Sequence, residues 1–118
     1  MSGIKYYPSR DQGKYQRVVQ TTSNIAVTYN EIGTLYYCYA PGDVYISLST
    51  TEDAKIPVGA QVDFLRLQGN VIFSPASGSI FYYSSAGTVP KIRIEQAACS
   101  FIKVANLEWA IVGDIVPS

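Results

Sequence analysis

Few residues in this chain of 118 could do chemistry, and they lie far apart. The chain contains no histidine, so it lacks the usual base of Ser-His-Asp and Cys-His sites and the commonest metal ligand. Cys38 and Cys99 do not have the paired spacing of a zinc site. We expect them to be small buried side chains in two strands. A disulfide between them is the alternative.

The carboxylates are dispersed, with one adjacent pair at Glu52-Asp53. Two neighbouring acids rarely suffice to bind calcium, so we expect a solvated loop at this pair. Glycoside hydrolysis needs two carboxylates held about 5 to 10 Å apart, and no spacing in the sequence predicts such a pair. Gly59 and Gly69 stand alone and do not form a phosphate-binding loop. We expect a non-enzymatic protein with no catalytic residue, no metal and no cofactor.

Aromatic side chains offer another kind of chemistry, because their faces stack on sugar rings. The chain has ten tyrosines and one tryptophan. Tyr45 near Asp43 is the first candidate for a sugar site, which keeps a carbohydrate-binding module open as an alternative. Trp109 precedes the apolar run Ala110–Val112, so we expect it to anchor the core rather than to face a ligand.

Short β-like runs must position these residues. Val44, Ile46 and Leu48 alternate with polar or aromatic residues, and Ile92 and Ile94 alternate with charged ones, which predicts strands with one buried face. Further strands are expected at Ile25–Tyr29, Thr34–Tyr39, Gln61–Leu67, Val71–Ser74, Ser79–Tyr83, Cys99–Val104 and Glu108–Val112. The only stretch expected to hold a helical turn is Thr50–Lys55.

Turn signals separate these runs at residues 40–43, 68–70, 75–78 and 84–87, and Asn106 is expected to adopt a left-handed conformation in a hairpin. Strands spaced about eight to twelve residues apart favour antiparallel all-β architectures. The sequence therefore predicts an all-β fold, a single antiparallel β-sandwich or barrel-like domain of about 8 to 10 strands with a short N-terminal arm.

The first 20 residues differ from the rest in charge, with four basic groups against Asp11 alone. Residues 21–118 carry a small acidic excess. We interpret residues 1–20 as a docking arm and residues 21–118 as the β-domain. The expected docking residues are Lys5, Tyr6, Tyr7, Arg10, Lys14, Tyr15 and Arg17. A frayed, solvated terminus is the alternative.

Four basic groups fall short of the stripe that binds nucleic acid, so no nucleic-acid partner is expected. No apolar run approaches the roughly 18 residues needed to span a membrane, and the polar N-terminus does not resemble a signal peptide.

Two expected strands, Thr34–Tyr39 and Ser79–Tyr83, carry large side chains on both faces. A sheet that faces water on one side should alternate with polar residues, so these rings favour a second covering surface. Tyrosine suits such a surface because it buries a ring while its hydroxyl finds a partner. The expected interface residues are Tyr36, Tyr37, Tyr39, Phe81, Tyr82 and Tyr83. The alternative is a sandwich whose own chain covers both faces.

Several short motifs follow one another between Ile56 and Asp114. Pro57 and Gly59 introduce a strand, a Gln-Gly step precedes a Val-rich strand, and an Ile-Lys-Val run precedes a Trp-x-Ile-x-Gly-Asp finish. The matching residues are Pro57, Gly59, Gln68, Gly69, Val71, Ile102, Lys103, Val104, Trp109, Ile111, Gly113 and Asp114. This half of the chain resembles a domain of tailed-bacteriophage virion proteins, often the C-terminal part of tail fibres or other appendages. The chain departs from the pattern at Asn70, where the family often has a second glycine-containing step.

The resemblance implies a β-rich, often trimeric virion component without catalytic residues. Because only about twenty residues precede the domain, we expect a capsid decoration, cement or head-fibre protein whose arm binds the shell. It would be made in the host cytoplasm and act in the virion, with the major capsid protein or a tail protein as partner. The alternative is a short tail-fibre or baseplate component that recognises the host, with a surface glycan as a further partner.

Overall fold

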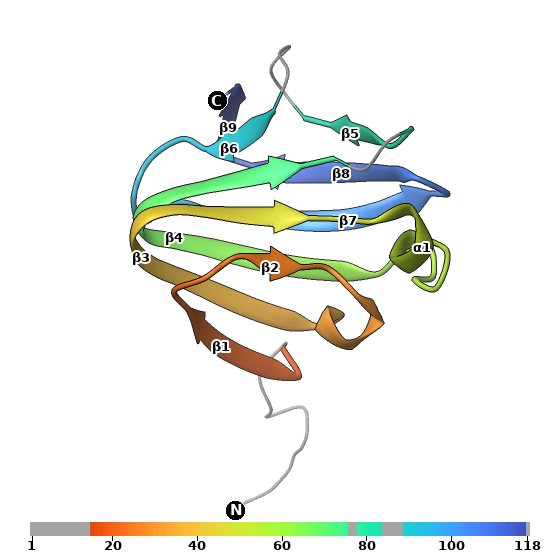
Figure 1. Ribbon diagram of the computed structural model, residues 1–118, viewed down its shortest axis with the longest axis horizontal. Helices are drawn as coiled ribbons and strands as arrows, with labels where there is room; N and C mark the ends of the chain where they lie inside the picture. Colours follow the sequence, from red (N-terminus) through yellow and green to blue (C-terminus); the bar gives the residue numbers. More distant parts are fainter. Residues whose placement is uncertain (1–14, 76–77, 84–88, 118) are drawn as a thin grey trace, which may run out of the picture.

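The computed structural model describes residues 15–75, 78–83 and 89–117, and these residues form one all-β unit (Figure 1). The strands are β1 (Arg17–Thr21), β2 (Ile25–Ala26), β3 (Thr34–Ser47), β4 (Gln61–Ser74), β5 (Ile80–Tyr82), β6 (Pro90–Ile92), β7 (Ala98–Ala105), β8 (Glu108–Gly113) and β9 (Ile115–Pro117). Two single turns of helix, η1 (Tyr29–Glu31) and α1 (Thr50–Asp53), lie between strands. The predicted all-β class is confirmed.

The nine described strands belong to one sheet that folds over on itself. The first halves of β3 and β4 form one layer with β1, β7, β8 and β5, and their second halves form the other with β2, β6 and β9. Figure 1 shows both long strands bending back at one side of the molecule. Phe64 and Phe73 lie on the same strand, yet their rings meet edge to face at 5.4 Å. The core therefore fills the space between the halves of bent strands.

Two of the expected turns are bends within strands. The signals at residues 40–43 and 68–70 lie inside β3 and β4, so four expected strands merge into two. At the bend, Gly69 has a φ of +71°, and a Cβ there would lie 2.1 Å from the carbonyl oxygen of Gly42 and 2.5 Å from that of Ala40. Only glycine allows the two backbones to approach this closely.

Gly69→Ala is expected to destabilise the fold far more than Gly59→Ala. Both glycines have a positive φ, which costs an alanine roughly 1 to 2 kcal/mol. A Cβ at Gly59 would meet nothing within 4 Å, whereas one at Gly69 would overlap the backbone of β3. Urea unfolding followed by circular dichroism measures the difference. Equal losses at the two positions would show that the close approach at the bend is not needed for stability.

The expected antiparallel pairing is observed for only part of the sheet. Four strand pairs are antiparallel, but β1 and β2 pair with β3 in parallel, as do β3 with β4 and β5 with β8. Residues 48–60, which include α1, carry the chain from the end of β3 back to the start of β4. A crossover of this length allows parallel neighbours, whereas a tight turn would make them antiparallel.

Several expected boundaries shift. Arg17–Thr21 is strand β1 of the sheet, so residues 17–20 belong to the β-domain rather than to the docking arm. Ile92 is fully buried as expected, but Ile94 is 47% exposed because β6 ends at Ile92. Val44, Ile46 and Leu48 form the predicted buried face.

Candidate functional site

Most of the expected docking residues cannot be placed. Lys5, Tyr6, Tyr7, Arg10 and Lys14 lie outside the described residues. The Tyr15 hydroxyl donates a hydrogen bond to Asp63 on β4, and this bond together with burial raises the pKa of Tyr15 to about 12. Arg17 donates to the carbonyl oxygen of Asn30 at 3.0 Å and to Thr34 Oγ1 at 3.2 Å. Both residues thus contact their own domain.

The six expected interface residues do not form one cluster. They lie on β3 and at β5, which are separated by β4, β7 and β8. Tyr36 and Phe81 point into the core, where they pack on Phe64 and Phe101. Burial and the neighbouring Glu31 raise the pKa of Tyr36. Tyr36 occupies an inward-facing position of β3 and therefore offers almost no surface to another subunit. Its expected role as an interface residue is wrong.

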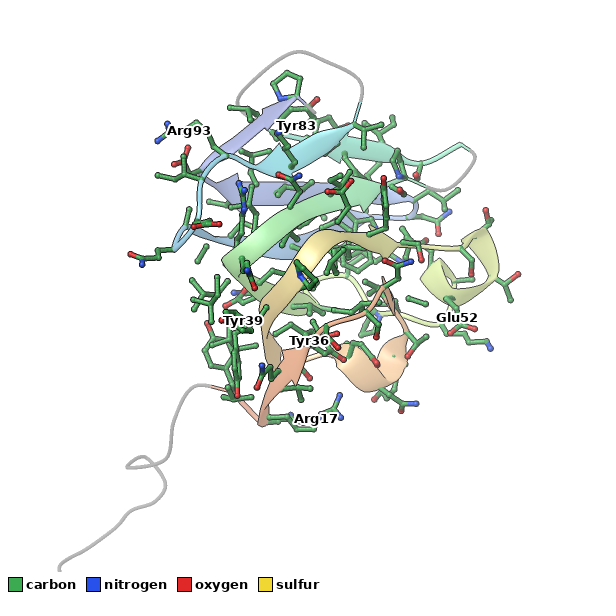
Figure 2. The ribbon with its side chains drawn as sticks, turned by 60° about the vertical axis from the view of Figure 1, so that its left-hand side comes forward. Arg17, Tyr36, Tyr39, Glu52, Tyr83 and Arg93 are labelled. Atoms are coloured by element: carbon green, nitrogen blue, oxygen red, sulfur yellow. The ribbon has the colours of Figure 1, made fainter. Side chains whose placement is uncertain are left out.

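The other four rings are more accessible. Tyr39 and Tyr82 are about half exposed, at 50% and 48%. Tyr37 and Tyr83 are partly buried, and the Tyr83 hydroxyl has no hydrogen-bond partner among the described residues. Figure 2 shows Tyr39 on β3 well apart from Tyr83.

Cys38 and Cys99 are free, buried side chains in β3 and β7, as expected. Burial raises the pKa of the Cys38 thiol to about 12 and raises that of Cys99 further. Both thiols are therefore protonated at neutral pH, which makes them poor nucleophiles and poor metal ligands.

The expectation of a solvated loop at Glu52-Asp53 is wrong for Asp53, which belongs to a buried polar cluster. The side chain of Asp53 is fully buried, and its carboxylate accepts hydrogen bonds from Trp109 Nε1 at 2.7 Å and from the backbone N–H of Leu107 at 3.0 Å. Lys103 Nζ lies 3.2 Å from the same carboxylate and also donates to the carbonyl oxygens of Asp53 and Ile56, at 2.7 and 2.8 Å. Only Glu52 is solvated, where it pairs with a surface lysine.

This cluster joins three separate segments and is closed to solvent. All three Lys103 protons are used, and Trp109 lies in the core as expected. The cluster also holds the β7–β8 hairpin, where Leu107 rather than Asn106 has the positive φ, at 60°. A buried polar network whose hydrogen bonds are satisfied makes the core more rigid and specific.

No group of three or more potential metal ligands occurs among the described residues. None of the helices in the described ranges is long and apolar enough to cross a membrane.

The candidate sugar residues do lie together, at the bend of β3 and β4. Asn70 Nδ2 donates to Asp43 Oδ1 at 2.8 Å, and the Tyr45 hydroxyl lies 3.5 Å from Asp43 Oδ2. Asn24 Oδ1 accepts from the backbone N–H of Tyr45 at 3.0 Å. Tyr45 is 42% exposed, so its ring is accessible from solvent.

The more extensive feature is the face of the six-stranded layer that points away from the core, here called the outer face. Residues that alternate with the buried ones on β1, β3, β4, β7, β8 and β5 make up this face. Its apolar members are Val18, Leu35, Tyr37, Tyr39, Leu65, Ala98, Ile102, Val104, Ala110, Val112, Ile80 and Tyr82. A sheet face directed to water normally carries polar side chains instead.

Exposure is concentrated on the outer face. Of the ten large apolar side chains that are exposed among the described residues, six belong to it: Val18, Tyr39, Ile80, Tyr82, Val104 and Val112. At one end, next to β5, Tyr82 and Val112 border an open groove of about 440 Å³.

The polar groups of the outer face bond to each other. Asp63 is buried and accepts from Tyr15 and from Gln61 Nε2, at 2.9 Å for the latter. Glu108 accepts from the Tyr82 hydroxyl at 2.8 Å, which raises the pKa of Tyr82. On the six strands of the outer face, no lysine or arginine lies at a described outward position.

Scans against protein-family models, curated proteins and solved structures found no match to this chain.

Proposed function

We propose that this chain is a non-enzymatic structural protein of a bacteriophage virion, most simply a capsid decoration, cement or head-fibre protein. The observation that supports it best is the apolar outer face. A patch of this kind on a small protein usually marks a protein–protein contact. Among the described residues, Asp53, Lys103 and Trp109 form a closed buried network, and Arg93 and Asp114 form a surface pair.

The virion assignment itself rests on the sequence resemblance between Ile56 and Asp114. Two of its motif residues have structural roles in this fold. Gly69 permits the bend of β4, and Trp109 donates to the buried carboxylate of Asp53. The motif therefore supports the proposal by indicating a shared fold. Detection of the protein in purified virions tests the assignment to a particle.

The docking arm is proposed to attach the protein to the shell through residues 1–14. Arg17 and Tyr15 contact the β-domain, so the proposed docking segment ends before them. Deleting residues 2–14 is expected to leave the circular-dichroism spectrum and the melting temperature unchanged, since β1 and the core remain. The truncated protein is expected to be lost from virions, as measured by its occupancy in purified particles.

A matched control keeps the length of the arm and replaces Lys5, Arg10 and Lys14 with serine. Reduced occupancy in this variant would attribute attachment to charge pairing, which salt screens at exposed sites. Full occupancy of the truncated protein would contradict attachment by the arm.

The alternative is a short tail-fibre or baseplate component that recognises the host, including a host surface glycan. The observation that favours it is the Asp43, Tyr45 and Asn70 group, which combines an accessible ring with carboxylate and amide groups. Under this alternative the arm deletion leaves particle occupancy intact, while Tyr45→Ala lowers adsorption to host cells.

A further inference from the structure

We infer that the outer face is the contact surface between copies of this chain. The inference deepens the proposed function, because it names the surface used for self-association. Its test needs only purified protein, so a failure to find the protein in virions would leave it standing.

The first argument is that the outer face is continuous. Pairing across the layer brings Val18 beside Leu35, Leu35 beside Asp63, and Asp63 beside Ser100. Val112 follows beside Ser100 and completes a row across five strands. A second row runs from Gln61 through Ile102 and Ala110 to Tyr82. The exposed apolar residues thus share one face of the sheet, around a polar centre in which Gln61 donates hydrogen bonds to Asp63 and Ser100.

The second argument is charge. The outward strand positions carry two carboxylates, Asp63 and Glu108, and each already accepts a hydrogen bond from its own chain. The described outward positions of the six strands carry no lysine or arginine, so they do not attract an acidic partner. Asp63 is buried and Glu108 is bonded to Tyr82, so neither acid is free to recruit a basic partner. A second copy of the same apolar face brings neither strong repulsion nor unpaired charge.

The third argument is size. Six strands about 4.8 Å apart, with an average length of about six residues within the layer, present roughly 600 Å² of projected area. Two such faces would together bury about 1,200 Å², which is above the roughly 1,000 Å² expected of a specific interface. Layers of this kind pack about 10 Å apart in sandwiches, so face-to-face packing of two sheets is a familiar geometry.

The decisive experiment places a charge on the outer face and measures mass. Val112 is 59% exposed on β8, and Val58 is 65% exposed in the loop before β4, outside the six strands. Light scattering at tens of micromolar is expected to give the wild type and Val58→Lys two or three times the chain mass of 12.9 kDa. Val112→Lys is expected to run as a folded monomer. Val18→Lys, at the other end of the face, provides an independent second variant.

Three results would overturn the inference. A monomeric wild type would show that the face does not associate at this concentration. If both Val112→Lys and Val18→Lys kept the oligomer mass of the wild type, the contact between copies would lie elsewhere. A wild-type monomer that associates after deletion of residues 2–14 would make that segment, rather than a second copy, the occupant of the face.

Discussion

Asp53→Ala is expected to lower the free energy of unfolding by about 3 to 5 kcal/mol, as the loss of one partner from a buried ion pair does. The substitution leaves the Lys103 ammonium buried without its carboxylate. It also removes the acceptor of two donors, the indole N–H of Trp109 and the backbone N–H of Leu107. Urea unfolding followed by circular dichroism measures the loss, which is a large fraction of the 5 to 15 kcal/mol typical of a domain.

Glu52→Ala is the matched control for this prediction. Glu52 is adjacent in sequence but lies at the surface, and its pair with Lys55 at 3.3 Å is solvated. Exposed pairs contribute little, so we expect a change of about 0.5 kcal/mol or less. Similar losses for Glu52→Ala and Asp53→Ala would mean that helix α1, rather than the buried carboxylate, carries the effect.

A double-mutant cycle separates the pair from its surroundings. Lys103→Met keeps most of the apolar stem and removes the charge, so Asp53 is then left buried without its cation. If the two residues act as one unit, the loss in the double variant is smaller than the sum of the two single losses. Strict additivity would show that each residue acts mainly through its other hydrogen bonds.

The sequence predicts the parts of this fold that depend on local alternation. Val44, Ile46 and Leu48 lie on the buried face, and Trp109 lies in the core, because apolar side chains at every second position of a strand share one face. The bends were not predictable in the same way. Pro41-Gly42 and Gln68-Gly69 break a strand pattern whether the chain reverses or the strand passes into another layer. Contacts distant in the sequence decide between these outcomes.

The buried cluster was missed for a similar reason. Asp53 is one of two adjacent acids after a polar run, which is typical of a surface loop. Lys103 lies two residues after the core residue Phe101 and therefore on the same face of β7. Because Ile102 and Val104 on the other face are also apolar, the sequence does not show which face points inward. The indole N–H of Trp109 was the available signal, because a buried tryptophan usually needs an acceptor.

The outer face was detected only in part. Large side chains on both sides of Thr34–Tyr39 indicate apolar residues on both faces of the strand, and Tyr39 and Tyr82 are exposed on the outer face. The positions on β7 and β8 were not recognised, because an apolar residue on either side of a strand is equally compatible with a covered sandwich face. Strand pairing, which joins Val112 to Val18 through three intervening strands, shows that these residues share one surface.

Trp109→Ala is expected to cost about 3 to 5 kcal/mol, as truncation of a large buried aromatic side chain does. The indole is fully buried and stacks on Phe101 with ring centroids 4.3 Å apart and planes inclined by 14°. Because Trp109 is the only tryptophan, unfolding must be followed by circular dichroism rather than by fluorescence. An unchanged unfolding midpoint would contradict its role in the core.

Trp109→Phe divides this loss between the ring and its polar group. Phenylalanine retains much of the contact with Phe101 but cannot donate to Asp53, so one acceptor of the buried carboxylate loses its partner. We expect a loss of about 1 to 3 kcal/mol, the usual effect of leaving a buried polar group unsatisfied. In the Asp53→Ala background that hydrogen bond is already absent, so the same substitution should cost measurably less. An equal cost in both backgrounds would show that Trp109 stabilises the fold by packing alone, and that the Asp53 carboxylate is held by Lys103 and Leu107.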